Sequence, residues 1–149
     1  PKLTAVAPCP LCAELAAILQ PDLETKDLQL VCETADDAGP LQADPELLRQ
    51  AIFNLVQNAI QFAPRGDRVT LALTTTASGE HSIEVRDRGP GVAEQDVPNL
   101  FTPYFTTRPD GTGLGLAIVR RIAAAHGWEV TYRPRPGGGS IFALEGIHG

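Results

Sequence analysis

One acidic residue stands where a carboxylate could recognise a ligand. Asp87 ends a run in which Ile83 and Val85 alternate with polar residues, so its side chain should point inward with theirs. Gly89 and Gly91 follow, and glycine lets a backbone approach a flat ligand closely. A carboxylate there could accept a hydrogen bond from an exocyclic amine such as that of adenine. The same residue types are also common in an ordinary turn that ends a strand.

A glycine-rich segment, residues 111–116 (GTGLGL), leads directly into a predicted helix. Unpaired backbone amides and the positive end of the helix dipole suit phosphate oxygens at such a position. The segment lacks the Gly-Lys-Ser/Thr of a Walker A loop. It also follows irregular chain instead of the strand that precedes a Rossmann turn. It is therefore a candidate phosphate site of another type, or a plain turn.

Two asparagines, Asn54 and Asn58, lie one helical turn apart on a predicted helix. An amide oxygen can ligate Mg²⁺ without adding negative charge beside a phosphate chain. Buried asparagine also serves simply to hydrogen-bond nearby backbone. The two belong to a stripe of uncharged polar side chains, unusual for a solvated helix face, that comprises Gln50, Asn54, Gln57, Asn58 and Gln61.

The elements that must position these residues follow from hydrophobic periodicity. Helices are predicted at residues 10–20, 44–63 and 113–126, and strands at 28–32, 69–76, 81–87, 128–133 and 140–145. This order indicates an α+β fold, a two-layer α/β sandwich with the helices on one face of the sheet. The buried face of the second helix is predicted to comprise Leu48, Ala51, Ile52, Leu55, Ala59 and Phe62.

Capping and breaking residues set the predicted ends of these elements. Asp44 should cap the second helix, and Pro45 suits its first position. Pro21 should end the first helix. Residues 34–43 are polar and rich in turn formers, and 88–112 show no lasting period. We expect the latter to be a long loop, with about 92–112 forming a lid over a ligand.

Composition limits the classes of function. The 149 residues fit one domain, 1–149. A net charge of −6 with 12 Lys and Arg argues against nucleic-acid binding. No apolar run is long enough to span a bilayer, so we expect a cytoplasmic domain without membrane contact, whose full-length protein could be anchored in the inner membrane by upstream sequence. The three cysteines, Cys9, Cys12 and Cys32, suggest reduced thiols. The Cys9/Cys12 pair could hold a metal, act in redox chemistry or simply pack.

Four segments occur together in one order: NLVQNA at 54–59, DRGPG at 87–91, LFTPYFTTR at 100–108 and GTGLGL at 111–116. They resemble the N box, first glycine box, F box and second glycine box of the GHKL, or Bergerat-type, ATP-binding fold. Further similarity to its sensor histidine kinase branch lies in Asp44-Pro45 and His126-Gly127. The resemblance implies a mixed sheet of about five strands with three main helices on one face.

The resemblance also implies roles for individual residues. Asn58 would ligate Mg²⁺, Asn54 would line the phosphate site and act in catalysis, and Asp87 would bind the adenine amine. Arg108 would reach the terminal phosphates, as in short-lid kinases of the nitrogen-regulation sensor type. The remaining ATP-binding positions would be Gly89, Gly91, Phe105, Thr107, Gly111, Thr112, Gly113, Leu114, Gly115, Leu116 and Ser140. Gln61 departs from the Lys or Arg that is common in the family, and Trp128 replaces a usual glycine.

The implied function is transfer of the γ-phosphate of MgATP to a histidine on an adjoining dimerisation domain, with a response regulator as a further partner. His81, His126 and His148 lie outside any acceptor motif, so the substrate histidine should lie outside this chain, which alone should bind ATP but be nearly inactive. The alternatives are a GHKL-type ATPase switch, a serine kinase of the anti-sigma type, and a non-catalytic nucleotide-binding module. The ATPase relatives carry a glutamate where Asn54 stands, and an amide cannot serve as a general base.

Overall fold

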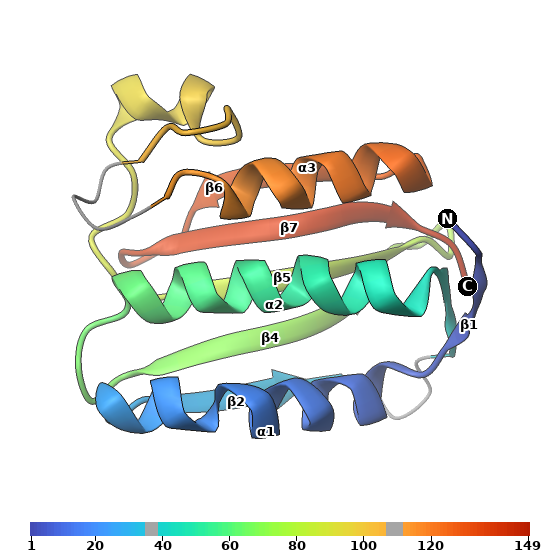
Figure 1. The fold of residues 1–149 in the computed structure, drawn as a ribbon, viewed down its shortest axis with the longest axis horizontal. Helices are drawn as coiled ribbons and strands as arrows, with labels where there is room; N and C mark the ends of the chain where they lie inside the picture. The colour runs from blue at the N-terminus through green and yellow to red at the C-terminus, as the bar shows by residue number, and fades with distance from the viewer. Residues whose placement is uncertain (35–38, 107–111) are drawn as a thin grey trace.

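The computed structural model describes residues 1–34, 39–106 and 112–149, which form two layers (Figure 1). Three helices cover one face of a five-stranded sheet, as the predicted α+β sandwich requires. The helices are α1 (Pro8–Thr25), α2 (Pro45–Phe62), α3 (Gly115–His126) and the short 3₁₀ helix η1 (Glu94–Asn99). The strands are β1 (Thr4–Val6), β2 (Gln29–Glu33), β3 (Leu41–Ala43), β4 (Arg68–Thr75), β5 (His81–Asp87), β6 (Glu129–Pro134) and β7 (Ser140–Ile147).

The large sheet is mixed, with strand order β2-β4-β5-β7-β6. Strand β2 runs parallel to β4, and the other neighbours are antiparallel. This arrangement puts β5 at the centre of the sheet, with β7 beside it, so the carboxyl end of β5 is enclosed by neighbouring strands. No helix of the described ranges is long and apolar enough to cross a membrane.

A second, two-stranded sheet was not predicted. Strand β1 pairs antiparallel with β3, which lies in a stretch expected to be turn-rich chain. In β3 the side chains of Leu41 and Ala43 are buried. Three residues are too short to show a convincing alternation, and the partner strand lies far away in sequence. The pairing is therefore a tertiary effect that local pattern does not reveal.

Helix α1 does not end at Pro21, contrary to expectation; it continues through the proline to Thr25. Proline removes one backbone donor, but Pro21 and Ala17, whose carbonyl loses its partner, are both exposed, so water can replace the lost hydrogen bond. The buried side chain of Leu23 anchors the last turn in the core. Tertiary packing thus outweighs the local cost of the proline.

Helix α2 begins as predicted. The Asp44 carboxylate accepts hydrogen bonds from the backbone N–H groups of Glu46 (3.1 Å) and Leu47 (3.2 Å), and Pro45 is the first helical residue. The Asp44 N–H donates to Nε2 of His126 at 3.1 Å, which ties this cap to the end of α3. His126 in turn stacks on Trp128, with ring centroids 4.0 Å apart. The start of α2 and the end of α3 are therefore one hydrogen-bonded unit.

The buried face of α2 is wider than predicted. It comprises Leu48, Ala51, Ile52, Leu55, Val56, Ala59 and Ile60. Val56 and Ile60 were not expected, and Phe62 is half-buried at the end of the helix instead of lying in the core. The helix is sandwiched between α1, α3 and the sheet, so a wider stripe than that of a surface helix is covered.

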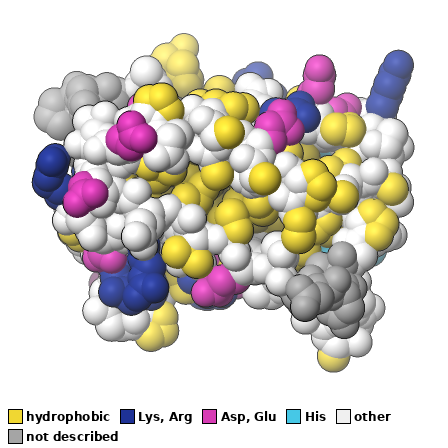
Figure 2. Space-filling model, turned by 90° about the horizontal axis from the view of Figure 1, so that it is seen from below, with side chains coloured by type: hydrophobic (Ala, Val, Ile, Leu, Met, Phe, Trp, Pro, Cys, Tyr) yellow, Lys and Arg dark blue, Asp and Glu magenta, His cyan; other side chains and the backbone are white. Residues whose placement is uncertain are grey.

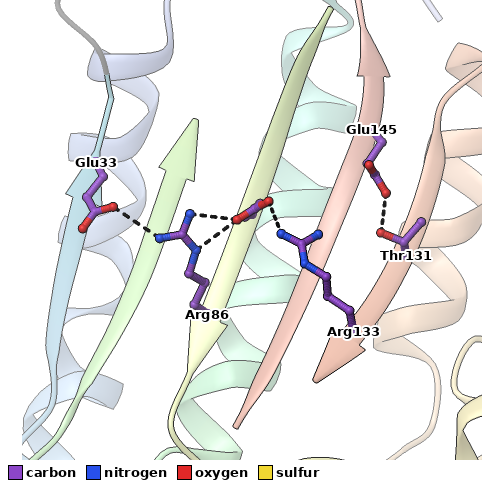
Figure 3. Close-up of polar contacts among 6 residues, drawn as sticks. Glu33, Arg86, Thr131, Arg133 and Glu145 are labelled. Atoms are coloured by element: carbon purple, nitrogen blue, oxygen red, sulfur yellow. Dashed lines mark hydrogen bonds and ion pairs between the residues drawn. The ribbon is translucent and has the colours of Figure 1, made fainter. Parts of the chain in front are cut away.

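The outer face of the sheet carries a charged network (Figure 3). The Glu84 carboxylate, on central strand β5, accepts hydrogen bonds from Arg86 at 2.8 and 3.0 Å and from Arg133 at 2.6 Å. Burial alone would raise the pKa of Glu84, but the hydrogen bonds and charges of Arg133 and Arg86 outweigh it and lower this pKa. Arg86 also reaches Glu33 on edge strand β2 (3.4 Å). This face is polar, whereas the opposite face packs against the helices.

The Asp44 cap generates a pH-dependent prediction. Hydrogen bonds from the backbone of Lys2, then of Leu47 and Glu46, lower the pKa of Asp44 below 3.8. The ionised Asp44 carboxylate therefore stabilises the fold above about pH 3.8. This stabilisation is lost as the pH falls through the pKa of Asp44 in the folded protein. Asp44→Ala should lower the urea midpoint at pH 7, and the difference from wild type should shrink near pH 3. An exposed control, Asp22→Ala, should show neither effect; equal behaviour of the two variants would contradict the capping role.

Candidate functional site

A cavity of about 460 Å³ opens among α2, the chain after β5 and the start of α3. Its polar wall consists of Asn54, Gln57, Asn58, Gln61, Thr106, Thr112 and Ser140. Its remaining wall consists of Phe62, Gly91, Val92, Leu100, Phe105, Gly113, Leu114, Gly115, Leu116, Ile118 and Phe142. Among the described lining residues none is charged, so recognition there depends on amides, hydroxyls, backbone groups and apolar surface.

The structure brings most of the predicted ligand-binding residues together on this wall. They are Asn54, Asn58, Gly91, Phe105, Thr112, Gly113, Leu114, Gly115, Leu116 and Ser140. Asp87 and Gly89 lie next to the wall instead of on it. Thr107, Arg108 and Gly111 lie outside the described residues, and their roles stay predictions.

Sequence reasoning missed several lining residues. They are Gln57, Gln61, Phe62, Val92, Leu100, Thr106, Ile118 and Phe142. Gln57 and Gln61 belong to the uncharged polar stripe of the second helix, and that stripe was sufficient signal to assign them. Phe142 shares the helix-facing side of β7 with Ser140, so strand alternation could also have indicated it. Contacts such as that of Leu100 depend on the path of the loop and have no local signal.

Asp87 ends β5 and is 2% exposed, directly opposite Ser140 in the β5–β7 ladder. Its Oδ1 accepts a hydrogen bond from the Gly89 N–H at 2.8 Å, while its Oδ2 is buried without a partner in the described parts of the chain. Burial raises the pKa of Asp87, against the Gly89 hydrogen bond and the charges of Arg135 and Lys26, which act to lower it. A buried carboxylate oxygen with no donor is costly, and it is available to a ligand that brings one.

Gly89 is required by packing. A Cβ at this position would collide with the carbonyl oxygen of Phe62, at the end of α2, and would lie 3.0 Å from Asp87 Oδ1. The absence of a side chain thus brings the turn after β5 against α2 and lets the Gly89 N–H reach the carboxylate. From the sequence we expected Gly89 to let the backbone approach a ligand. In the structure it lets the backbone approach the end of α2.

Asn54 and Asn58 face the cavity from α2 but differ in the hydrogen bonds that their side chains make. The Asn54 side-chain amide donates to the Gln50 carbonyl at 2.9 Å, and its Oδ1 faces Gly115, where an added Cβ would lie 3.3 Å away. The Asn58 Nδ2 is buried and has no hydrogen-bond partner in residues that the structure describes. Asn54 therefore partly fits the backbone-bonding alternative, whereas Asn58 is an amide free to bind a ligand.

The N-terminus of α3 lies at the cavity and has no side-chain cap. Its N-cap residue, Leu114, offers no side-chain hydrogen bond to the first turn, and that turn holds no acidic residue. Within the described parts of the chain, the Thr112 hydroxyl oxygen accepts a hydrogen bond from the Leu114 N–H, at 3.3 Å. Gly115 and Leu116 line the cavity, so the uncapped amides and the positive end of this 12-residue helix lie at its wall.

A tight backbone contact holds the two ends of the loop that precedes α3. The Tyr104 N–H donates to the Gly113 carbonyl at 2.8 Å. Gly113 has a φ of +73°, and a Cβ there would lie 2.7 Å or less from Tyr104 backbone atoms. Tyr104 itself has a φ of +67° and is 76% exposed. Only glycine allows this approach at residue 113, and the contact fixes where the loop leaves and rejoins the domain.

Two features define the class of this domain: a two-layer α+β sandwich, and a cavity whose described wall is uncharged, with a buried carboxylate next to it and the open N-terminus of a helix on its wall. The chain belongs to the family described as histidine kinase-, DNA gyrase B-, and HSP90-like ATPase, whose model matches residues 43–145. The family predicted from the four sequence segments is thereby confirmed.

Relatives of this family are similar over most of the chain. The sensor histidine kinase ZraS of Escherichia coli (strain K12) is 38% identical over 128 residues, 85% of this chain and 27% of ZraS. The chain thus spans about a quarter of that relative. Full-length ShkA, solved in complex with AMPPNP, is 31% identical with a TM-score of 0.86, over 97% of this chain and 30% of ShkA. The nucleotide-free catalytic domain of histidine kinase ThkA is 26% identical with a TM-score of 0.87, over 98% of this chain and 95% of that domain.

The buried carboxylate generates a prediction for the ligand-free protein. Because the pKa of Asp87 is raised above 3.8 in the folded state, the folded chain binds this proton more tightly than the unfolded chain does. Ionised Asp87 therefore reduces stability at neutral pH. Asp87→Asn keeps an oxygen for the Gly89 N–H and should raise the urea midpoint at pH 7, with a smaller gain near pH 3. The exposed control Asp22→Asn should change little, and a less stable Asp87→Asn protein at pH 7 would contradict this account.

Proposed function

We propose that this domain binds MgATP and positions its γ-phosphate for transfer to a histidine on an adjoining dimerisation domain of a two-component sensor kinase. The observation that carries the proposal is Asp87 Oδ2, which has no partner among the described residues and lies beside a cavity that also reaches the uncapped start of α3. A fitting ligand would bring a hydrogen-bond donor to Asp87 and an anion to the start of α3. Adenine with a phosphate chain supplies both.

Support for the adenine end comes from the chemistry around Asp87. Its Oδ2 can accept from an exocyclic amine, whereas a guanine carbonyl at the same place would face a carboxylate. Gly91, Phe142 and Ser140 line the nearby wall and leave room for a flat ring. The binding energy of this contact must exceed the cost that the buried charge imposes on the free protein.

Support for the phosphate end comes from charge and backbone geometry. The described cavity wall holds no acidic side chain that would repel phosphates. The first-turn amides of α3 can donate to phosphate oxygens, and the side-chain oxygen of Asn54 lies against Gly115 at the same end. Arg108 would add the positive charge that Gln61 does not provide.

The magnesium proposal rests on Asn58. Its buried amide is uncommitted through Nδ2, and the oxygen and nitrogen of an amide exchange places by a simple flip. In the described parts of the chain no group of three His, Cys, Asp or Glu side chains could hold a metal by itself. This fits Mg²⁺, which commonly takes one or two protein oxygens and completes its shell with phosphates and water. When bound, the ion would neutralise phosphate charge.

The site favours transfer to an external acceptor over hydrolysis. A water-activating base needs a carboxylate or imidazole, and the described wall has neither. Asn54 cannot accept a proton, and its amide N–H already donates to Gln50. His81 is buried against Thr75, and His126 is hydrogen-bonded to Asp44 and Ile122. The acceptor histidine is therefore assigned to another domain, and a response regulator would receive the phosphoryl group from it.

Nucleotide selectivity should depend on Asp87. We expect the chain to bind ATP at least tenfold more tightly than GTP, since a hydrogen bond to a charged group is worth about 1.5 kcal/mol or more. Asp87→Asn should weaken ATP binding by about tenfold or more while the folded state is retained. Titration calorimetry with both nucleotides and both proteins measures this. Equal affinities for ATP and GTP in the wild type would exclude Asp87 as the adenine contact.

The transfer itself can be tested with γ-labelled ATP. The chain alone should bind MgATP, hydrolyse it slowly and remain unlabelled. Joined to a histidine-bearing dimerisation domain, it should label that domain with a bond that acid cleaves, because phosphohistidine is a phosphoramidate. Arg108→Ala should reduce labelling more than ATP affinity, since its charge would act on the transferring phosphate. A matched variant with the acceptor histidine replaced by alanine is the control.

Two outcomes would contradict the kinase proposal. An acid-stable label would indicate a serine kinase, and brisk hydrolysis by the isolated chain would indicate an ATPase switch.

A further inference from the structure

All three cysteines of the chain converge on one place, away from the cavity described above. Cys9 and Cys12 lie in the first turns of α1, and Cys32 lies in β2. Cys12 and Cys32 lie close enough for each thiol to shift the pKa of the other. The Cys9 sulfur lies 3.1 Å from the hydroxyl of Thr34, directly after β2. The two cysteines of the helix thus face residues 32 and 34, which share one side of the strand.

An independent feature places Cys12 beside the strand. A small cavity of about 20 Å³ is lined by Cys12, Thr34 and Leu71 among other residues, and Leu71 is the ladder partner of Cys32. The space beside the Cys12 sulfur gives this side chain room to rotate. The cluster is thus a geometric feature of the α1–β2 contact.

The cluster is also accessible. Strand β2 is the edge of the large sheet, and Cys9 and Cys32 are exposed whereas Cys12 is buried. Figure 2 views the molecule from the side of α1 and β2, where hydrophobic side chains make up much of the surface. A small uncharged oxidant can therefore reach Cys32. In the described ranges no group of three His, Cys, Asp or Glu side chains could hold a metal ion.

We infer that Cys12 and Cys32 form a reversible redox pair, in which a peroxide converts the two thiols into a disulfide that joins α1 to β2. The sulfur of Cys32 attacks one peroxide oxygen, the O–O bond breaks, and Cys32 becomes a sulfenic acid with release of water or alcohol. The sulfur of Cys12 then attacks the sulfur of Cys32, the S–O bond breaks, and water leaves. The two thiols lose two electrons, the peroxide gains them, and a thiol reductant reverses the reaction.

The order of these steps follows from the surroundings of the two sulfurs. Burial, with further contributions from Cys32 and Cys9, raises the pKa of Cys12 to about 12, so Cys12 is a poor first nucleophile. Burial also raises the pKa of Cys32, but the hydrogen bond from Cys12 opposes this rise. Of this pair, the exposed Cys32 is therefore the thiol that meets the oxidant, and the buried Cys12 beside it is the resolving thiol.

The test uses the chain with hydrogen peroxide, followed by blocking of the remaining thiols, trypsin digestion and mass spectrometry. Cleavage after Lys2, Lys26 and Arg49 separates residues 3–26, which hold Cys9 and Cys12, from residues 27–49, which hold Cys32. Wild type and Cys9→Ser should each lose two thiols and give the two peptides in a linked form that dithiothreitol separates. In Cys9→Ser the linked pair can only be Cys12 with Cys32. Cys9 is exposed, so its replacement leaves the buried Cys12 in place.

Cys32→Ser is the matched control, because it retains the closely spaced Cys9 and Cys12. It should keep its thiols under conditions that oxidise the wild type. The oxidised Cys9→Ser protein should also have a higher urea midpoint than its reduced form, since the bond limits the unfolded chain. The proposal is overturned if Cys9→Ser keeps both thiols, if Cys32→Ser is oxidised as fast as the wild type, if the linked peptides come from covalent dimers, or if oxidation lowers the urea midpoint.

Discussion

A negative charge in the middle of the sheet is the constraint around which this domain is organised. Asp87 is 2% exposed at the end of a central strand, with one oxygen bound to the Gly89 N–H and the other without a donor in the described structure. Gly89 can turn there only because it lacks a side chain that would strike the end of α2. The position of α2, and with it that of Asn54 and Asn58, is thus coupled to the same carboxylate. A fold selected for stability alone would not retain such a group.

The two faces of the sheet differ in whether their buried carboxylates are paired with arginine side chains. On the outer face, Glu84 is paired with Arg86 and Arg133, so its carboxylate stays ionised and satisfied (Figure 3). On the helix side, Asp87 has no hydrogen-bonded cationic partner among the described residues, although the charges of Arg135 and Lys26 act on it. The described wall of the cavity beside it is lined by amides, hydroxyls and apolar groups. This division explains why an acidic domain can still offer a site suited to an anion.

Local sequence pattern predicted the elements that local forces determine. The cap at Asp44 and the central hairpin are encoded by neighbouring residues, as is the one-turn spacing of Asn54 and Asn58, and these agree with the structure. The failures required distant partners: the pairing of β1 with β3, and the passage of α1 through Pro21, which the burial of its last turn sustains. At the site, the glycine-rich segment was predicted together with its apolar residues Leu114 and Leu116. Apolar lining residues outside the motifs, such as Ile118 and Phe142, were missed, because an apolar residue carries no sign of which cavity it faces.

The contact between Tyr104 and Gly113 has a consequence for evolution of the loop between them. Because the two ends are joined by a backbone hydrogen bond and close packing, the domain core does not depend on how many residues connect them. Lengthening a loop whose ends are fixed costs roughly 0.6 kcal/mol per doubling of its length. Insertions and deletions in this segment are therefore nearly neutral for folding. Any limit on its length must therefore come from the ligand-binding roles predicted for its residues, Arg108 among them, and not from the stability of the domain.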